Sequence, residues 1–204
     1  LSVRKITRKA STRIARTAFS LAAHRNRKVT VAHKANVFRV SDGLFLEAVR
    51  AVREEFPDFE YEEIIIDAMA ALLIRDPSQF DVIVTTNMYG DILSDEASEI
   101  AGSLGMAASL NAGEHFVMAQ AQHGSAPNLA GQNIANPSSL IGSAAMLLRW
   151  IAERHHSPQF NFAAQEIERA IATAVGSPST RTRDLGGELG TRAFTDTLLA
   201  IINK

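Results

Sequence analysis

Two aspartates stand four residues apart in the segment Asn87–Asp95, which reads NMYGDILSD. If a helix begins in this segment, Asp91 and Asp95 lie on one face of it, one turn apart. Carboxylate oxygens that converge from one turn suit a hard divalent cation such as Mg²⁺ or Mn²⁺. The spacing also fits a plainer interpretation, in which Asp91 caps the helix and Asp95 is a solvated acid near its N-terminus. From the spacing alone, both interpretations stay open.

A third aspartate, Asp67, lies inside the apolar run Ile64–Ile74. An ionised carboxylate in apolar surroundings is costly unless it is paired with a cation or bound to a metal. We therefore expect Asp67 to have a partner. The alternative is that Asp67 follows a strand and caps the next helix.

Lys34 ends an expected strand, with His33 before it and Asn36 shortly after it. A lysine beside a cation site can be held with a lowered pKa and can take part in proton transfer. A single lysine is far more often a surface residue, and His33 alone would be interpreted as structural. Lys34 is therefore a candidate site residue only in combination with the other motifs.

Two polar loops lie further along the chain. His123–Asn128 (HGSAPN) contains Gly and Pro, and Asn136–Ser139 (NPSS) leads into an expected helix. Such loops can present backbone N–H groups and a helix N-terminus to an anionic cofactor. An ordinary surface loop has the same composition, so this alternative stays open. Neither the Gly-rich dinucleotide fingerprint nor the Walker P-loop occurs in the sequence.

The hydrophobic pattern predicts alternating strands and helices, which is typical of an α/β fold. The expected strands are Val29–Ala32, Ile64–Ile66 and Asp81–Thr86. The first expected helix is capped at Ser11 or Thr12 and has Ile14, Ala18, Leu21 and Ala22 on one face. A second helix opens at Ser41 and is stopped by Pro57, and a loop that begins at Asn87 precedes the helix Ile92–Ala101. The other expected helices are Ala68–Ile74, Ser138–Arg154, Ala163–Ala174 and Thr191–Ile202. Between them, Gly102–Pro137 shows little periodicity, so we expect a domain boundary followed by a long functional loop region.

The bulk composition excludes several classes of function. The chain is 46% hydrophobic and 21% charged with a net charge of −1, so we expect no nucleic acid as a partner. No apolar stretch reaches the roughly 18 residues that a membrane span needs. The sequence has no cysteine, which excludes disulfides and thiolate chemistry and fits a cytoplasmic protein. Because the chain begins with leucine, we expect it to be an internal segment of a longer protein.

Five motifs occur in a fixed order along the chain. They are HKAN with Lys34, IIDAMA with Asp67, NMYGDILSD, HGSAP and NIANP. The set resembles the β-decarboxylating 2-hydroxyacid dehydrogenases, the isocitrate and isopropylmalate dehydrogenase family, over essentially the whole chain. NMYGDILSD is the most specific of the five.

The resemblance implies oxidation of a malate substituted at C3, with hydride transfer to NAD(P) and loss of CO₂. A divalent metal, Mg²⁺ or Mn²⁺, would chelate the substrate and stabilise the enolate that forms. By resemblance, the metal ligands are Asp67, Asp91 and Asp95. Lys34 and Asp67 would be catalytic, and Asn36 would lie by the substrate and nicotinamide. The cofactor-binding positions that the resemblance implies are Asn87, His123, Gly124, Ser125, Ala126, Asn128 and Asn136.

The resemblance also implies a homodimer with shared active sites. Lys34 and Asp67 match positions that one subunit donates to its neighbour's site, whereas Asp91 and Asp95 act in their own subunit. The implied fold has two α/β lobes and differs from the doubly wound dinucleotide fold. Residues 1–101 would belong to the smaller, dimer-forming lobe, and residues 102–204 to the C-terminal part of the larger, cofactor-binding lobe. The portion of the family fold before Leu1 would hold the residues that recognise the substrate, so this chain alone is expected to be inactive.

Two departures from the family pattern bear on the cofactor. Gln120 stands where the family usually has a glutamate, and Asn128 replaces the aspartate that is common in NAD users. NADP users carry a lysine at the place of Asn128, so we expect NAD rather than NADP, with modest discrimination. Arg181 and Arg183 are the weak point of this prediction, because their loop could reach the ribose pocket.

HKANVFRVSDGLFL resembles NAD-isocitrate and homoisocitrate dehydrogenases, whereas DAMA resembles isopropylmalate dehydrogenase. The substrate therefore stays open among isocitrate, homoisocitrate and isopropylmalate. One rival hypothesis is a non-catalytic regulatory subunit of a hetero-oligomeric NAD-isocitrate dehydrogenase. Such subunits tend to lose metal or cofactor residues, but this sequence keeps Lys34 and all three aspartates. A second rival is a plain structural or interaction domain, which would bind neither Mn²⁺ nor NAD.

Overall fold

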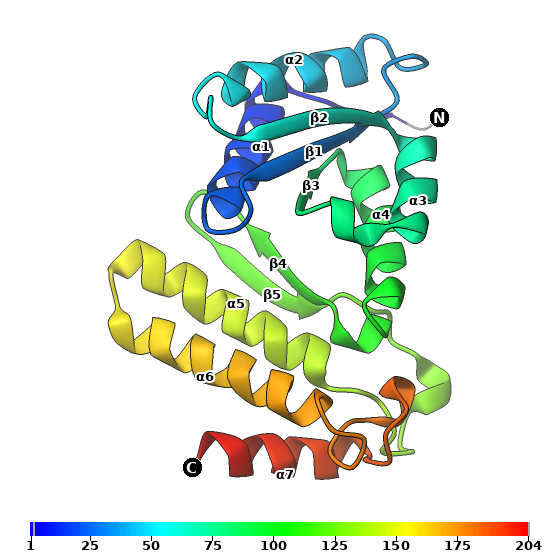
Figure 1. Ribbon diagram of the computed structural model, residues 1–204, viewed down its shortest axis with the longest axis vertical. Coiled ribbons are helices and arrows are strands. Elements are labelled where there is room, and N and C mark those ends of the chain that lie inside the picture. Colours follow the sequence, from blue (N-terminus) through cyan, green and yellow to red (C-terminus); the bar gives the residue numbers. More distant parts are fainter. Residues whose placement is uncertain (2, 204) are drawn as a thin grey trace. The chain divides into compact units, whose positions relative to one another are not determined.

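The computed structural model describes residues 1 and 3–203, which form two compact units. The first unit is Leu1–Ile100, and the second begins at Ala101. In the first unit, the elements in chain order are α1 (Arg8–Ala23), β1 (Lys28–His33), α2 (Ser41–Arg53), β2 (Glu60–Ile65), α3 (Ile66–Arg75), the 3₁₀ turn η1 (Pro77–Gln79), β3 (Val82–Val84) and α4 (Asn87–Ile100) (Figure 1). This order confirms the prediction of an α/β arrangement.

A parallel three-stranded sheet with the order β2-β1-β3 organises the first unit. The central strand β1 is apolar and β-branched, and Val29–Ala32 is buried completely. Its alternate residues serve two layers, because side chains along a strand point to opposite faces. Val29 and Val31 belong to the core that α1 and α2 cover, and Ala32 belongs to the core that α3 and α4 cover.

The parallel direction of the strands places their carboxyl ends at one edge of the sheet, which we call the carboxyl edge. Lys34 follows β1, Asp67 comes two residues after β2, and Thr85 and Thr86 follow β3. Thr85 ties two of these strand ends together, since its hydroxyl donates to the Ala32 carbonyl at 2.7 Å. Open α/β sheets bind ligands at this edge because the loops that follow the strands gather there.

Three local predictions in the first unit were wrong. The first helix begins at Arg8 with Thr7 as its N-cap, and it buries Ala15 and Phe19 while Ile14 and Leu21 stay exposed. The strand predicted at Ile64–Ile66 is β2, which ends at Ile65 and is only half-buried because it is an edge strand. The loop predicted at Asn87 is instead the first turn of α4.

The second unit packs helices on an antiparallel hairpin. Its elements are η2 (Leu104–Met106), β4 (Ala108–Ala112), β5 (Val117–Ala121), η3 (Pro127–Leu129), α5 (Ser138–His155), α6 (Pro158–Val175), η4 (Arg183–Leu185) and α7 (Thr191–Ile202). A core between α6 and α7 is formed by Ala170, Ala174, Phe194 and Leu198. The three helices fall close to the positions expected from the 3.6-residue period.

The hairpin β4–β5 lies within Gly102–Pro137, where we predicted a loop region. The two strands read ASLNA and VMAQA, so small and polar residues replace the β-branched residues that strands favour. Short polar strands of this kind give no clear period-2 pattern. The prediction was wrong here because the hairpin is stabilised from outside, by the helix that packs on it.

Two buried serines of α5 hold both hairpin strands. The Ser143 hydroxyl accepts from the Ser109 N–H at 2.9 Å and lies 2.7 Å from the Gln120 carbonyl oxygen. One turn earlier, the Ser139 hydroxyl accepts from the Gln122 N–H at 3.1 Å and donates to the Ala107 carbonyl. Ser143 therefore bonds one backbone group of each strand, and Ser139 bonds the residues just before β4 and just after β5. These bonds fix the register of a hairpin that is otherwise marginal.

Within the described residues, none of the helices is both long enough and apolar enough to cross a bilayer.

Removing one of these hydroxyls provides a test of how the hairpin is held. We expect Ser143→Ala to lower the free energy of unfolding by about 1–3 kcal/mol, because two partly buried backbone groups of the hairpin lose their partner. The matched control is Thr173→Ala, an exposed helix position whose hydroxyl bonds only its own helix. Urea denaturation of both variants measures the difference, and equal midpoints would show that the serine does not hold the hairpin.

Candidate functional site

Lys34 and Asp67 meet at the carboxyl edge. The Lys34 ammonium forms an ion pair with the Asp67 carboxylate, although 33 residues separate them. The sheet makes this possible, because His33 at the end of β1 pairs with Ile65 at the end of β2. Two residues that the sequence analysis selected independently therefore form one charged group.

Asp67 is exposed, contrary to what its apolar neighbours suggested. Its side chain is 69% exposed, since it occupies the first turn of α3 while Met69 and Leu73 bury the opposite face. The hydrogen bond from Lys34, together with its own backbone N–H, holds the pKa of the Asp67 carboxyl below its usual range. The carboxylate is thus ionised near neutral pH, as a metal ligand must be.

The turn that carries Lys34 is closed by hydrogen bonds. The Val37 and Phe38 N–H groups both donate to the Lys34 carbonyl, at 2.9 and 2.8 Å. The His33 Nδ1 atom accepts from the Ala35 N–H at 3.1 Å, and burial lowers the pKa of His33, which favours the neutral ring that this bond needs. Asn36 lies at the exposed tip of the turn.

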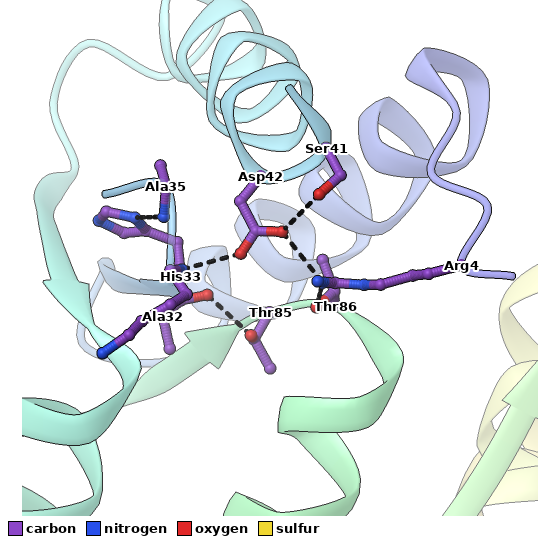
Figure 2. A network of polar contacts seen from close by, with 9 residues as sticks. Arg4, Ala32, His33, Ala35, Ser41, Asp42, Thr85 and Thr86 are labelled. Atoms are coloured by element: carbon purple, nitrogen blue, oxygen red, sulfur yellow. Dashed lines mark hydrogen bonds and ion pairs between the residues drawn. The ribbon is translucent and has the colours of Figure 1, made fainter. Parts of the chain in front are cut away.

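A buried carboxylate lies directly behind this turn (Figure 2). Asp42, in the first turn of α2, is fully buried and accepts from the Lys34 N–H at 2.8 Å. Arg4 forms an ion pair with its other oxygen at 3.0 Å and donates to the Thr86 hydroxyl at 2.8 Å. Asp42 was not among the predicted site residues, because its place near the start of a helix does not show that it is buried. A buried acid there requires a cation such as Arg4.

Helix α4 carries the other two predicted metal ligands. Asp91 and Asp95 are exposed and one helical turn apart, while Tyr89 and Leu93 are buried on the opposite side. Asn87 is the exposed first residue of the helix. Among the residues that the structure describes, no three His, Cys, Asp or Glu side chains are arranged to hold a metal ion. Asp67 therefore does not complete a three-carboxylate site with the α4 aspartates of its own chain.

A pocket of about 360 Å³ lies in the second unit. Four predicted cofactor residues, His123, Gly124, Ser125 and Ala126, line it. Ala126 adopts a left-handed conformation with φ 40°, which costs an alanine on the order of 1 kcal/mol and turns the chain into η3. The remaining wall comes from Leu129–Gly131, Asn133, Ala135 and the start of α7.

Arg192, in the first turn of α7, also lines this pocket, and the sequence analysis did not select it. It was hidden because nearly 70 residues separate it from the HGSAP motif. The Arg192 N–H donates to the Asn133 side chain at 3.0 Å, which joins the α7 start to the loop. A guanidinium at this position can bind an anionic group of a ligand. Arg181, which we had singled out, lines a different pocket of about 440 Å³ with Asp184.

Two further predicted cofactor positions are arranged differently. Asn128 lies in η3 but does not line the pocket. Asn136 is buried, and its amide is already in use: the side-chain oxygen accepts from the Ser138 N–H at 2.9 Å, and the nitrogen donates to Asp184 at 3.0 Å. Any contact from Asn136 to a ligand would therefore come from its backbone. The Gln120 side chain is exposed on β5.

Comparison with known proteins gives consistent matches over the whole chain. The isocitrate dehydrogenase [NAD] catalytic subunit 5, mitochondrial, of Arabidopsis thaliana is 43% identical over 196 residues, which are 95% of this chain and 50% of that protein. The 3-isopropylmalate dehydrogenase of Sulfurisphaera tokodaii is 46% identical over 98% of this chain and 58% of its own length. The isocitrate/homoisocitrate dehydrogenase of Thermus thermophilus is 44% identical over the same shares.

A solved structure agrees with these matches. The isocitrate dehydrogenase of Methylococcus capsulatus superposes with a TM-score of 0.90 and 39% identity, covering 100% of this chain and 59% of that one. The chain thus has the fold of the corresponding part of an isocitrate dehydrogenase, and it spans about half to three fifths of the length of these relatives. The sequence model of the isocitrate/isopropylmalate dehydrogenase family matches residues 1–198. The chain therefore belongs to the isocitrate/isopropylmalate dehydrogenase family.

Proposed function

We propose that the protein to which this chain contributes oxidatively decarboxylates a 3-substituted malate and transfers the hydride to NAD. The observation that carries the proposal is the Lys34–Asp67 ion pair at the carboxyl edge of the parallel sheet. The substrate class is isocitrate, homoisocitrate or 3-isopropylmalate, because relatives of all three names match this chain at similar identity. Since the chain spans only part of these relatives, the activity is proposed for the whole protein.

The donor atoms fit a divalent cation. Three exposed carboxylates, on Asp67, Asp91 and Asp95, would hold Mg²⁺ or Mn²⁺, for which oxygen ligands are preferred. The cation would supply Lewis acidity at the oxygens of the substrate. Lys34 would assist removal of the 2-hydroxyl proton, and Asn36 at the tip of its turn would contact the substrate. The pocket lined by His123–Ala126 would hold NAD. The roles of Asn87, Asn128 and Asn136 in cofactor binding stay predictions.

We further propose a homodimer in which each active site takes residues from both subunits. Lys34 and Asp67 form a pair within one chain, and Asp91 and Asp95 lie on another element of that chain without completing a three-carboxylate group. A partner's Lys34–Asp67 pair would complete the site at Asp91 and Asp95.

The predicted cytoplasmic location stays a prediction, since some relatives are named as mitochondrial subunits.

The role of Lys34 is tested by removing its amine. We expect Lys34→Met in the full-length protein to lower kcat about 10²-fold or more, the scale of a general acid–base group, with smaller changes in the binding of Mn²⁺ and NAD. Steady-state kinetics and equilibrium titrations measure both quantities. The control is Lys28→Met, which removes the lysine at the first residue of β1, whereas Lys34 follows its last residue. Near wild-type turnover of Lys34→Met would remove this lysine from the mechanism.

Shared active sites predict complementation between two inactive variants. A Lys34→Met subunit and an Asp95→Asn subunit should each be inactive alone. In a mixed dimer, one of the two sites receives an intact Lys34 and an intact Asp95, so the isolated mixed dimer should have about half of the wild-type activity. The assay follows NADH formation after co-expression and isolation of the mixed dimer. If the mixed dimer forms but stays inactive, each site is built from one chain.

The cofactor preference is tested with both nucleotides. The loop 128–134 carries no basic residue, so we expect a higher kcat/KM with NAD than with NADP. Arg192 lines the pocket and can contact a phosphate, so the preference should be modest. We expect Arg192→Met to lower kcat/KM with NADP about tenfold more than with NAD, the scale of one charge-assisted hydrogen bond.

The control for this experiment is Arg181→Met, because Arg181 lines the other pocket of the same unit. A higher kcat/KM with NADP in the wild-type protein would overturn the NAD assignment. If Arg181→Met rather than Arg192→Met changed the ratio, the pocket described above would not be the ribose site.

A further inference from the structure

Asp42 is a buried charge that no step of the proposed reaction uses. Its side chain is fully buried, and one of its carboxylate oxygens accepts from the Lys34 N–H at 2.8 Å. The other oxygen is 3.0 Å from the Arg4 guanidinium and 3.3 Å from the Ser41 hydroxyl. A buried carboxylate with a charged partner and several donors is held in one geometry, because any displacement would leave a charge unpaired.

Arg4 connects Asp42 to the residues that follow β3. The same Nη2 atom that pairs with Asp42 donates to the Thr86 hydroxyl at 2.8 Å, directly before α4 (Figure 2). The guanidinium also lies 5.3 Å from the Phe38 ring centroid and 5.1 Å from that of Tyr89. Phe38 closes the Lys34 turn, and Tyr89 is a buried residue of the first turn of α4. Arg4 therefore contacts both the Lys34 turn and the start of the helix that carries Asp91 and Asp95.

We propose that Asp42 is a positioning residue for Lys34, and that Arg4 holds Asp42 in place while fixing the start of α4. The hydrogen bond to the Lys34 backbone sets where the lysine side chain begins, and the closed turn leaves it little freedom. Errors of about 1 Å in the placement of a catalytic group can lower a rate 10²-fold. The proposal rests on the proposed role of Lys34, because positioning matters only if the amine takes part in the reaction.

The opposite edge of the same sheet offers a matched control. Asp81 is also buried, with 4% of its side chain exposed, and it also pairs with an arginine, Arg25, at 2.6 Å. It likewise accepts from a backbone N–H, that of Asn26, at 3.0 Å. Asn26 comes before β1, whereas Lys34 comes after it. The two carboxylates thus have similar chemical surroundings, but only Asp42 touches the turn of the candidate site.

The experiment compares Asp42→Asn with Asp81→Asn in the full-length protein. Both changes remove one buried charge, so urea denaturation should show a loss of stability in each. We expect Asp42→Asn to lower kcat about tenfold or more with little change in the KM for substrate, and Asp81→Asn to leave kcat within about twofold. Equal effects on kcat from the two variants would overturn the proposal.

A double variant shows whether Asp42 acts through Lys34. If it does, Asp42→Asn should cause no further loss of kcat in a Lys34→Met background, because the group that it positions is already absent. A further tenfold loss in that background would overturn the proposal. If Asp42→Asn does not fold, Arg4→Lys, which keeps the charge but loses the planar fork, takes its place in the comparison with Asp81→Asn. The double-variant criterion is kept for Asp42 alone, because Arg4 also contacts the start of α4. If Lys34→Met is fully active, the proposed role of Lys34 fails, and the positioning role of Asp42 fails with it. If the wild-type protein oxidises none of the three substrates, the proposed function itself fails, so the two failures are distinguishable.

Discussion

The candidate site depends on the parallel pairing of β1 with both of its neighbours. Antiparallel pairing would separate the residues that follow β1 and β2 by the full length of the sheet. Parallel pairing instead places His33, the last residue of β1, beside Ile65, the last residue of β2. Lys34 reaches Asp67 from there. The same register places Thr86 near Arg4. A crossover helix between parallel strands is therefore a requirement of the chemistry as much as of the packing.

The carboxyl ends of the strands carry the candidate site, whereas the amino ends carry a structural ion pair. At the amino ends of the strands, Asp81 and Arg25 join the turn before β1 to the start of β3. At the carboxyl edge, Asp42 and Arg4 make an equivalent connection, but behind a turn that carries a charged and accessible pair. Similar buried ion pairs thus brace both ends of the strands, and the one at the carboxyl edge lies behind the Lys34–Asp67 pair.

The sequence predicts much of this arrangement, and its failures have physical causes. Asp67, Asp91 and Asp95 became candidates because carboxylates stand beside apolar runs or on one helix face, but the local pattern left plainer interpretations open. Lys34 and the three aspartates were selected as one set only through the ordered motifs of the resemblance. Asp42 and Arg4 were not selected, since their pairing spans 38 residues and neither residue has an unusual local neighbourhood. Arg192 was missed for the same reason. Contacts that fold topology creates leave no signal in local spacing.

The predictions of helices and strands divide in the same way: elements with a regular local pattern were located, and elements that depend on tertiary contacts were not. Amphipathic helices such as α5 and α7 were located well, because a 3.6-residue period records which face is buried. The hairpin β4–β5 was not, since its strands have small and polar side chains and depend on the serines of α5. The half-burial of β2 was also hidden, because an isoleucine run does not show whether a strand lies at the centre or the edge of a sheet.

The hydrogen bond between the Gln122 N–H and the Ser139 hydroxyl has a consequence for how this protein can vary. Gln122 directly precedes the HGSAP motif, and Ser139 lies just after the start of α5, so this bond closes the base of the whole loop between them. The bond joins the end of the hairpin directly to the helix, while Asn133 and Asn136 anchor the C-terminal part of the loop. Lengthening such a loop costs little free energy, since closure entropy grows only slowly with length. Insertions and replacements inside the loop can therefore reshape the pocket while the register of the hairpin stays unchanged.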